Sequence, residues 1–381
     1  MRLAFFFILI NAVFDLPGGI PLAWAESGFK AEHLNHVTVE ASAPGYKEAL
    51  YYSMLDTKER TVQCRLCPKK CTVAEGAQGF CRARENRDGK LYSLGYGFPC
   101  AVHVDPIEKK PFFQVMPKTL SFSLAAAGCN FRCQNCQNWQ ISQISPKESQ
   151  NLKLSPEEII KLAGEKECRS VAFTYTEPMI FYEYMLDICR LAKKAGLHTV
   201  CHSNGSINPE PLRELCPVLD AANIDLKGFN RDFYRNNCGG ELDDVLSTLL
   251  VLHEQKVWIE ITNLVIPGMN DDLELIRKMC EWIRDNLGTD VPLHFSRFYP
   301  CYRLTSMTPT PVSTLTKARG IAKKAGLKFV YIGNVPGNEA ENTICPKCGK
   351  ILIKRAGYEI LEMNIEEGKC KYCKEKIPGI W

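Results

Sequence analysis

Between about residue 119 and about residue 335, short apolar runs alternate with stretches whose apolar residues recur at helical spacing. Regular strand–helix alternation predicts an α/β fold with a parallel sheet and right-handed crossovers. Because six or seven units fall short of the eight that close a barrel, we expect a partial (β/α)6-type barrel, open on one side. The predicted strands are 120–126, 170–175, 198–202, 222–226, 257–266, 293–298 and 328–332.

Two of the intervening helices have clear start signals. Ser155 can act as N-cap, Pro156 as the first helical residue and Glu158 as the third, which together make a capping box. A second helix is expected from Asp271 onward, because apolar residues follow it at helical spacing. These residues are Leu273, Ile276, Cys280, Ile283 and Leu287.

Length, charge and cysteine content narrow the class of protein. The 381 residues allow one large catalytic domain with small appendages. The net charge of +4 is spread along the chain, which does not favour a nucleic-acid or membrane-surface protein. The 19 cysteines are too few for a disulfide scaffold, and eleven of them form three groups with the short spacings of metal sites. We expect the other eight to be buried small apolar residues: Cys100, Cys168, Cys189, Cys201, Cys216, Cys238, Cys280 and Cys301.

The middle group, Cys129, Cys133 and Cys136, follows the first predicted strand with the spacing C-x3-C-x2-C. Three thiolates can hold three corners of a cubane iron–sulfur cluster, which normally takes four cysteines. The remaining iron is then open to a ligand, and an open position distinguishes a catalytic metal site from a structural one. The placement agrees, because active sites of barrel folds gather at the carboxyl ends of strands. A zinc site completed by a distant histidine or cysteine is the alternative.

The first group has the less typical spacing C-x2-C-x3-C-x9-C and consists of Cys64, Cys67, Cys71 and Cys81. Four ligands close a metal site, so we expect a structural or electron-carrying role. Zinc and a second iron–sulfur cluster both remain open. Nearby basic residues would attract an acidic electron donor or simply form a solvated face. They are Lys69, Lys70, Arg82 and Arg84.

The last group contains two C-x2-C pairs about twenty residues apart, a pattern typical of a tetrahedral zinc ribbon. Its members are Cys345, Cys348, Cys370 and Cys373. Iron in a rubredoxin-like site is the alternative. The module would act either as a substrate-docking or lid module or as an element that stabilises the fold. Apolar residues between the pairs would form its small sheet: Ile351, Leu352, Ile353, Tyr358 and Ile360.

The N-terminus has the pattern of a secretory signal or anchor. Arg2 precedes an apolar run at 4–13, and Ala23-Trp24-Ala25 has the A-x-A form of a cleavage site. The run is short for a membrane span, and a non-native leader is the alternative. Oxygen-sensitive thiolate chemistry instead favours the cytoplasm. We divide the chain into a signal-like segment 1–25, a cysteine-rich segment 26–118, the barrel 119–335 and a zinc-ribbon-like module 336–381.

The loop Cys129–Cys136 resembles the signature of the radical S-adenosylmethionine (SAM) superfamily, which follows the first barrel strand. Four later segments resemble the family's SAM-binding motifs, each at the end of a predicted strand and in the family's order. They are Phe173-Thr174-Tyr175-Thr176-Glu177-Pro178, His202-Ser203-Asn204-Gly205, Asp225-Leu226-Lys227 and Ile266-Pro267-Gly268-Met269-Asn270-Asp271.

Within the superfamily the chain is most similar to the AmmeMemoRadiSam-system radical SAM group, which is itself similar to pyruvate formate-lyase activating enzymes. The similarity spans about residues 50–381, including the segments 64–68, 105–111, 129–139 and 378–381. Two departures stand out. Asn135 replaces an aromatic or apolar residue before the third cysteine, and Tyr175-Thr176 replaces a double glycine.

The resemblance implies an oxidoreductase with a [4Fe–4S] cluster on Cys129, Cys133 and Cys136 and SAM on the open iron. One electron, from a donor such as flavodoxin or ferredoxin, cleaves SAM to methionine and a 5′-deoxyadenosyl radical. That radical abstracts hydrogen from a substrate. The implied cofactor-binding residues are Asn138, Tyr175, Thr176, Glu177, Ser203, Asn204, Asp225, Lys227, Ile266 and Asn270.

The resemblance favours a protein substrate, as in glycyl-radical-activating enzymes. A small molecule or RNA is the alternative within the same chemistry, although no dense basic stripe supports RNA. A non-catalytic metal-binding or metal-transfer protein is the alternative of another class. Further side chains at predicted strands are candidates to line the pocket: His202, His294, Arg297, Tyr299, Glu260 and Asn263.

Overall fold

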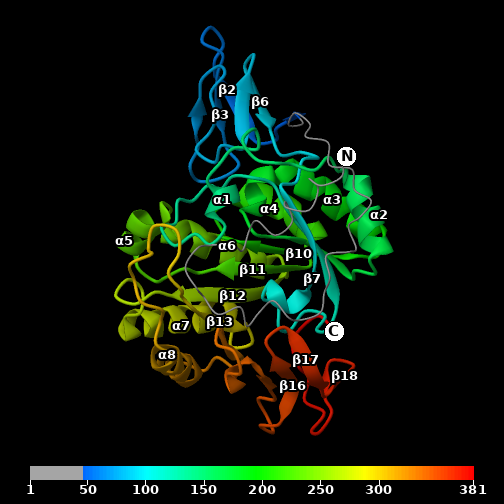
Figure 1. The fold of residues 1–381 in the computed structure, drawn as a ribbon, viewed down its shortest axis with the longest axis vertical. Helices are drawn as coiled ribbons and strands as arrows, with labels where there is room; N and C mark the ends of the chain where they lie inside the picture. Colours follow the sequence, from blue (N-terminus) through cyan, green and yellow to red (C-terminus); the bar gives the residue numbers. More distant parts are fainter. Residues whose placement is uncertain (1–45) are drawn as a thin grey trace, which may run out of the picture. The chain divides into compact units, whose positions relative to one another are not determined.

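An eight-stranded sheet organises residues 46–381, the part of the chain that this computed structural model describes. Its strand order is β14-β13-β12-β11-β10-β9-β8-β7, and β8 to β14 are parallel (Figure 1). All seven predicted strands are present, and the expected α/β fold with a partial barrel is confirmed. The parallel strands are β8 (Leu120–Ala125), β9 (Ser170–Phe173), β10 (His198–Ser203), β11 (Ala221–Asp225), β12 (Trp258–Val265), β13 (Leu293–Arg297) and β14 (Val330–Gly333).

One strand of this sheet was not anticipated. β7 (Ala101–Pro106) lies in the segment that we assigned to the N-terminal part, yet it pairs antiparallel with β8, from Ala101 opposite Ala125 to Pro106 opposite Leu120. As an edge strand it tolerates a proline at its end. Its register depends on β8, so the pairing could not be read from its own residues.

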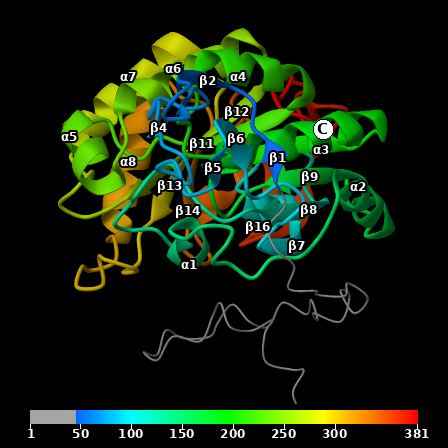
Figure 2. The ribbon, with the colours of Figure 1, turned by 90° about the horizontal axis from the view of Figure 1, so that it is seen from above.

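Helices cover the sheet and form an outer arc around the strands (Figure 2). The capping box of α2 is present, with Glu158 N donating to Ser155 Oγ at 3.2 Å and Ser155 N to Glu158 Oε2 at 2.7 Å. The helix expected from Asp271 instead has Asp272 as its N-cap, while Asp271 accepts from Gly268 N. The main helices are α2 (Pro156–Glu165), α3 (Tyr182–Lys194), α4 (Pro209–Leu215), α6 (Leu242–Glu254), α7 (Leu273–Leu287) and α8 (Val312–Lys324).

Two shorter helices lie in loops at the carboxyl side of the sheet, α1 (Trp139–Ser142) and α5 (Arg231–Phe233). α5 runs into a π-helical turn at Tyr234–Cys238, which ends at Gly239 in the left-handed conformation. Within residues 46–381, no helix combines the length and apolar character needed to cross a membrane. The signal-like segment 1–25 lies outside the described residues.

The N-terminal cysteine-rich part folds into two small antiparallel sheets (Figure 1). It is tied to the barrel by a buried ion pair between Arg84 and Glu183, whose side chains are 1% and 2% exposed. One sheet contains β1 (Lys47–Glu48), β6 (Lys90–Ser93) and β5 (Arg84–Arg87), and the other contains β2 (Tyr52–Asp56), β3 (Thr61–Cys64) and β4 (Thr72–Val73).

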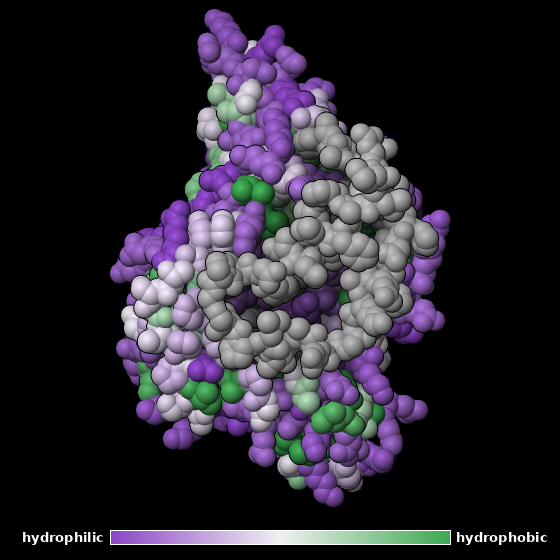
Figure 3. Space-filling model, in the orientation of Figure 1, coloured by the Kyte–Doolittle hydropathy of each residue, from purple (hydrophilic) through white to green (hydrophobic). Residues whose placement is uncertain are grey.

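The C-terminal module contains the small sheet that we expected, except that Tyr358 lies in the turn between two strands. Leu352 and Ile353 pack in one hydrophobic cluster with Tyr331 of β14 and with Phe113, which precedes β8 in the chain. Hydrophobic side chains also reach the surface of this module (Figure 3), among them Leu361 and Met363. Its strands are β15 (Thr343–Ile344), β16 (Ile351–Ala356), β17 (Glu359–Met363), β18 (Ile365–Glu366) and β19 (Lys369–Cys370).

Candidate functional site

The loop that carries the middle cysteines leaves the carboxyl end of β8 and leads into α1. Backbone hydrogen bonds hold it from two sides: Gly128 N donates to Ile141 O at 2.9 Å, and Arg132 N donates to Cys238 O at 2.7 Å. Within the loop, Phe131 N donates to the Cys129 sulfur at 3.3 Å. The three thiols therefore extend from a fixed backbone at the expected end of the sheet.

The spacing of the thiols fits a cluster better than a single ion. Within residues 46–381, the C-terminal four-cysteine group is the place where three or more possible metal ligands all lie within 4.8 Å of one another. The sulfurs of Cys129, Cys133 and Cys136 do not all lie within 4.8 Å of one another. One tetrahedral zinc ion would draw its sulfurs to about 3.8 Å from one another, whereas a cubane places each cysteine on its own iron. The residues present fit a polynuclear iron–sulfur cluster.

Glu177 links the ends of β9 and β10. Its carboxylate is 1% exposed and accepts hydrogen bonds from Ser203 Oγ at 2.7 Å, Asn204 N at 2.8 Å and Met179 N at 3.1 Å. Burial raises the pKa of Glu177 to about 7. Because its oxygens are engaged within the protein, Glu177 acts as a positioning residue for the two strand ends.

Replacing Glu177 by glutamine is expected to change how stability depends on pH. The folded state of the wild type binds this proton more tightly than the unfolded state, because the pKa is about 7 when folded and 4.5 ordinarily. The free energy of unfolding should therefore fall as pH rises from about 5 to about 8, by about 3 kcal/mol from this group. Glu177→Gln should lack that fall. Anaerobic urea unfolding at about pH 5 and about pH 8 measures the free energy of unfolding of both proteins. An equal change with pH in the wild type and the variant would contradict the raised pKa of Glu177.

Asn204 joins this network to the cysteine loop. Its Nδ2 lies 3.7 Å from the Cys129 sulfur and donates to Asn130 Oδ1 at 2.8 Å. Its Oδ1 accepts from Ser206 N at 2.8 Å, which fixes the orientation of the amide. The loop and the end of β10 are thus held together through two asparagine side chains.

A second polar group lies at the ends of β10 and β11. Asp225 Oδ1 lies 2.9 Å from His202 Nε2, and Asp225 Oδ2 accepts from Lys227 Nζ at 2.8 Å. Although burial opposes ionisation, Lys227 and His202 hold the pKa of Asp225 well below its usual range. Asp225 in turn, with the thiols of Cys133 and Cys238, holds the pKa of the buried Lys227 well above its usual value. The pair places a positive charge beside the cysteine loop.

In the segment after β9, Tyr175-Thr176 stands where the radical SAM family that the sequence resembles has a double glycine. The backbone there still adopts a conformation that favours glycine. Tyr175 has φ 66°, a left-handed conformation that favours glycine. Its carbonyl accepts from Asn138 Nδ2 at 2.7 Å, and its hydroxyl donates to Asp105 of β7. Thr176 Oγ1 donates to Ala126 O at 2.7 Å. These contacts hold the strained segment against the start of the cysteine loop.

Asn270 fastens the loops after β11 and β12. Its Nδ2 donates to Lys227 O at 2.6 Å and to Leu264 O at 2.8 Å, and its Oδ1 accepts from Ile266 N at 2.6 Å. The amide is engaged by backbone groups, so Asn270 positions the turn at Ile266 for whatever binds beside it.

Two pocket candidates lie elsewhere. Glu260 is the third residue of the eight-residue β12 and lies toward its amino end, where it accepts from the backbone N of Phe113 and Gln114. His294 Nε2 lies 2.6 Å from Glu260 Oε2, and both side chains are buried. This pair joins the segment at Phe113 to the sheet and is structural. Alternation along a strand shows only which residues share a face, so the sequence did not show that Glu260 would meet His294 and the segment at Phe113.

The other pocket candidates lie at the carboxyl side. Asn263 Nδ2 donates to Leu226 O at 2.8 Å, and Arg297 Nε donates to Thr310 O at 2.8 Å. Arg297 Nη1 also donates to the hydroxyl of Tyr299 at 3.1 Å. Their polar groups hold loops around the site.

Sequence reasoning missed Cys238 as a neighbour of the site. We expected a buried small apolar residue, and it is buried, but its thiol is hydrogen-bonded to that of Cys133. It also missed the stacking of Trp139 on Tyr302, with ring centroids 5.2 Å apart, which brings the loop after β13 over the cysteine loop. The residues of each contact are far apart in the sequence, so no motif or spacing predicts either contact.

The C-terminal cysteines form a compact group. The sulfurs of Cys345 and Cys373 are 3.6 Å apart, and those of Cys348 and Cys370 are 3.8 Å apart. Both distances match the edge of about 3.8 Å expected for a tetrahedron with metal–sulfur bonds of about 2.3 Å. The donor set therefore fits one tetrahedral metal ion.

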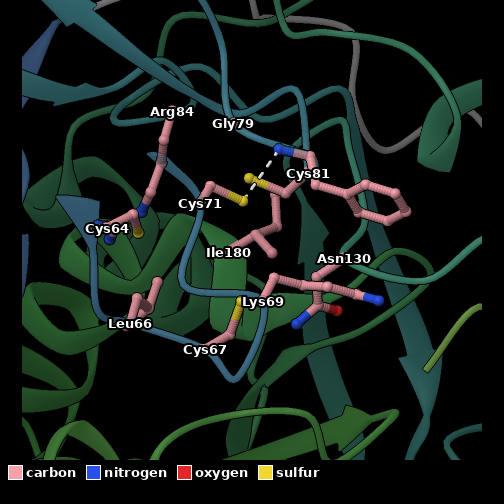
Figure 4. A pocket seen from close by; sticks show the side chains of 11 residues that line it. Cys64, Leu66, Cys67, Lys69, Cys71, Gly79, Cys81, Arg84, Asn130 and Ile180 are labelled. Carbon is pink, nitrogen blue, oxygen red and sulfur yellow. Dashed lines mark hydrogen bonds between the residues drawn. The ribbon is translucent and has the colours of Figure 1, made fainter. Parts of the chain in front are cut away.

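The first cysteine group lines a cavity in the N-terminal part (Figure 4). All four thiols belong to its wall, together with Leu66 and Ile180. Asn130 of the cysteine loop also reaches this wall, so the cavity adjoins the candidate active site.

A comparison with family models relates part of the chain to one superfamily. The model of the radical SAM superfamily matches residues 124–280. An uncharacterized protein of Methanocaldococcus jannaschii is 47% identical over 333 residues, which cover 87% of this chain and 98% of that one. Pyruvate formate-lyase 1-activating enzyme of Escherichia coli is 23% identical over 54% of this chain and 89% of its own. The crystal structure of a radical SAM methyltransferase from Sphaerobacter thermophilus aligns with a TM-score of 0.47 and 13% identity over 80% of this chain and 81% of that one.

Proposed function

The chain belongs to the radical SAM superfamily, and we propose that it is an enzyme that takes a hydrogen atom from a protein substrate. The observation that carries the proposal is the loop of Cys129, Cys133 and Cys136, whose thiols lie at the carboxyl ends of the parallel strands and are not all within 4.8 Å of one another. Those three residues would hold the [4Fe–4S] cluster. When bound, the cluster and SAM supply one-electron reductive cleavage to methionine and a 5′-deoxyadenosyl radical that abstracts hydrogen.

The surrounding side chains would orient SAM and keep its site rigid. Glu177 fixes the ends of β9 and β10 against each other, so the polar groups of Thr176 and Ser203 stay in register. The ammonium group of Lys227, held in place by Asp225, would attract negative charge beside Cys133. We propose as the SAM-contacting set Asn138, Tyr175, Thr176, Ser203, Asn204, Asp225, Lys227 and Ile266, with Glu177 and Asn270 positioning them.

Two features support a protein substrate over a small molecule or RNA. The sheet ends at β7 on one side and β14 on the other, so the strands do not close the barrel, which would leave a side open to a macromolecular segment. The net charge of +4 is small for an RNA-binding protein. The likeness to glycyl-radical-activating enzymes makes a backbone glycine the favoured hydrogen donor.

Deuterium transfer tests the proposal. Lysate of the source cells, grown with deuterated glycine, is separated into a macromolecular fraction and a small-molecule filtrate. Each is incubated anaerobically with the reconstituted enzyme, dithionite and SAM, and the mass of 5′-deoxyadenosine is measured. We expect one added deuterium with the macromolecular fraction, and loss of that label after protease treatment.

Other outcomes would contradict the protein substrate. Label transfer from the filtrate, or sensitivity to ribonuclease in place of protease, would identify a small molecule or RNA. Absence of 5′-deoxyadenosine with every fraction, from a protein that holds a reduced cluster, would contradict SAM cleavage itself. We propose flavodoxin or ferredoxin as the physiological electron donor.

For the C-terminal module we propose zinc and a stabilising role. Arg355 of β16 donates from Nη2 to Phe113 O at 2.8 Å and from Nη1 to Thr343 Oγ1 at 2.8 Å, so the module is joined to the barrel part. We expect one zinc per chain by elemental analysis, lost in Cys373→Ser. That loss should also make the region after 336 sensitive to protease, because metal binding drives the folding of such modules. Cys280→Ser, a buried thiol in α7, is the control for a general cysteine effect. Iron at this site in protein expressed with ample zinc would contradict the proposal.

A further inference from the structure

We propose that Cys64, Cys67, Cys71 and Cys81 hold a second iron–sulfur cluster, which passes electrons to the site on the Cys129–Cys136 loop. The relay role rests on the proposed function, whereas the presence of the cluster does not. The cluster would be of the all-cysteine type, [2Fe–2S] or [4Fe–4S], both of which four thiolates can hold.

Sulfur spacing separates this group from the C-terminal one. In the C-terminal group all four sulfurs lie within 4.8 Å of one another, as one ion requires. Among the residues that the structure describes, no three thiols of the first group meet that criterion, although all four line one cavity. The three sulfurs of the middle group do not all lie within 4.8 Å of one another either. A polynuclear cluster separates its cysteines because they bind different irons, so the first group resembles a cluster site more than a zinc site.

The wall of the cavity suits a cluster that carries electrons. Phe80 N donates to the Cys71 sulfur at 3.3 Å (Figure 4), and the backbone N of Lys69 and Ala83 donate to Cys67 and Cys81. Hydrogen bonds to sulfur are among the factors that set the reduction potential of a cluster. Leu66 and Ile180 supply apolar walls. The same kind of bond, from Phe131 N to Cys129, occurs at the middle group.

The two cysteine sites are in direct contact. Asn130 is hydrogen-bonded to the Cys67 thiol, and its Oδ1 accepts from Asn204 Nδ2, which lies 3.7 Å from the Cys129 sulfur. A Cβ at Gly128 would meet the carbonyl oxygen of Cys81 at 2.6 Å, so the two backbones touch. A continuous hydrogen-bonded path therefore joins a ligand of one site to a ligand of the other.

Arg132 braces the same junction. It donates from Nη1 to Cys129 O at 2.7 Å and from Nη2 to Phe80 O, and its guanidinium lies 4.0 Å from the centroid of the Phe80 ring. This side chain spans from the middle group to the wall of the first group. Its contacts keep the distance between the two sites fixed, as electron transfer between them requires.

The electron balance is simple. Reduced flavodoxin or ferredoxin loses one electron to the first cluster, which then loses that electron to the cluster at Cys129, Cys133 and Cys136. Cleavage of SAM consumes it, so no further oxidant or reductant is needed. Exposed basic residues close to the first group would attract an acidic donor. They are Arg65, Lys70 and Arg82.

Metal and sulfide analysis of a variant without the middle group tests the site. Cys129→Ala/Cys133→Ala/Cys136→Ala, reconstituted anaerobically, should keep about two to four irons per chain with an equal amount of acid-labile sulfide. After dithionite it should show an electron paramagnetic resonance signal that SAM does not alter. Adding Cys67→Ala and Cys81→Ala should remove iron, sulfide and signal. Cys168→Ala, a buried thiol outside the three groups, is the matched control and should lose none.

Two results would overturn the second cluster. The first is that the variant without Cys129, Cys133 and Cys136 contains two zinc ions per chain and no acid-labile sulfide. The second is that the wild-type protein contains only about four irons per chain in total. The wild-type count needs no variant, so it decides the question even if the triple variant fails to fold. Neither measurement depends on SAM cleavage, which keeps this test separate from that of the proposed function.

Two further measurements test the contact between the two cluster sites and the direction of electron flow. Fully reduced wild-type protein should show a paramagnetic resonance spectrum broadened by coupling between clusters, unlike the sum of the two single-cluster variants. In Cys67→Ala/Cys81→Ala, formation of 5′-deoxyadenosine driven by flavodoxin should fall at least about tenfold more than formation driven by dithionite. An additive spectrum, or equal losses with both reductants, would contradict the relay.

Discussion

Cys133→Ala is expected to lower the formation of 5′-deoxyadenosine from SAM by about a thousandfold or more. Cys133 is buried, belongs to the three-cysteine loop and lies close enough to Lys227 for the cation to affect its ionisation. Two cysteines cannot hold three corners of a cubane, so iron and sulfide at this site should be lost together with activity. The assay is anaerobic, with excess dithionite and chromatography of the product.

The control for this variant is Cys280→Ala in α7. Cys280 is also a buried free thiol, but it belongs to no cysteine group. It should retain cluster content and product formation. A Cys133→Ala enzyme with more than about a tenth of wild-type activity would contradict ligation by Cys133. The neighbouring Cys238, whose thiol contacts Cys133, would then be the first residue to examine.

Glu183→Gln is expected to destabilise the protein by about 3–5 kcal/mol. Glu183 of α3 accepts from Leu50 N at 2.7 Å and pairs with Arg84, whose Nη1 also donates to Leu50 O at 2.9 Å. Both charged side chains are almost fully buried, so removing one charge leaves the other without compensation. The pair joins the N-terminal sheets to the barrel, and its loss should loosen that attachment.

Anaerobic chemical unfolding measures the loss of stability, and limited proteolysis locates it. We expect new cleavage within residues 46–98 before any cleavage in the barrel. Asp88→Asn is the matched control, because it removes one charge from the exposed pair Arg60–Asp88, with side chains 57% and 84% exposed. Exposed pairs contribute about 0–1 kcal/mol. Similar effects of the two substitutions would show that Arg84–Glu183 does not hold the two parts together.

Local patterns in the sequence account for much of the fold. The seven parallel strands, the capping box at Ser155 and the sheet of the C-terminal module all follow from periodicity and short-range signals. The N-cap of α7 was misplaced by one residue, because Asp271 and Asp272 are equally good capping residues. The antiparallel β7 was missed, because an edge strand is defined by its partner.

The candidate site shows the same division. The spacing of Cys129, Cys133 and Cys136 indicated a metal site with an open position, because ligand spacing along a loop is a local property. Similarly, the C-terminal cysteine pairs indicated a tetrahedral ion, and their sulfur distances agree. In contrast, the sequence did not distinguish zinc from iron–sulfur at the first group, because the separation of its sulfurs depends on how the surrounding loops pack.

Tertiary structure alone decided which distant residues meet. The sequence by itself determined the order of strands and helices, the three cysteine groups and the resemblance that proved to be a family. Packing decided that Asn130 and Asn204 join two cysteine sites, that Cys238 touches Cys133, and that Glu260 and His294 pair away from the cysteine loop. The physical reason is that periodicity and ligand spacing act over a few residues. Contacts between residues far apart in the chain arise only when the whole sheet and its loops assemble.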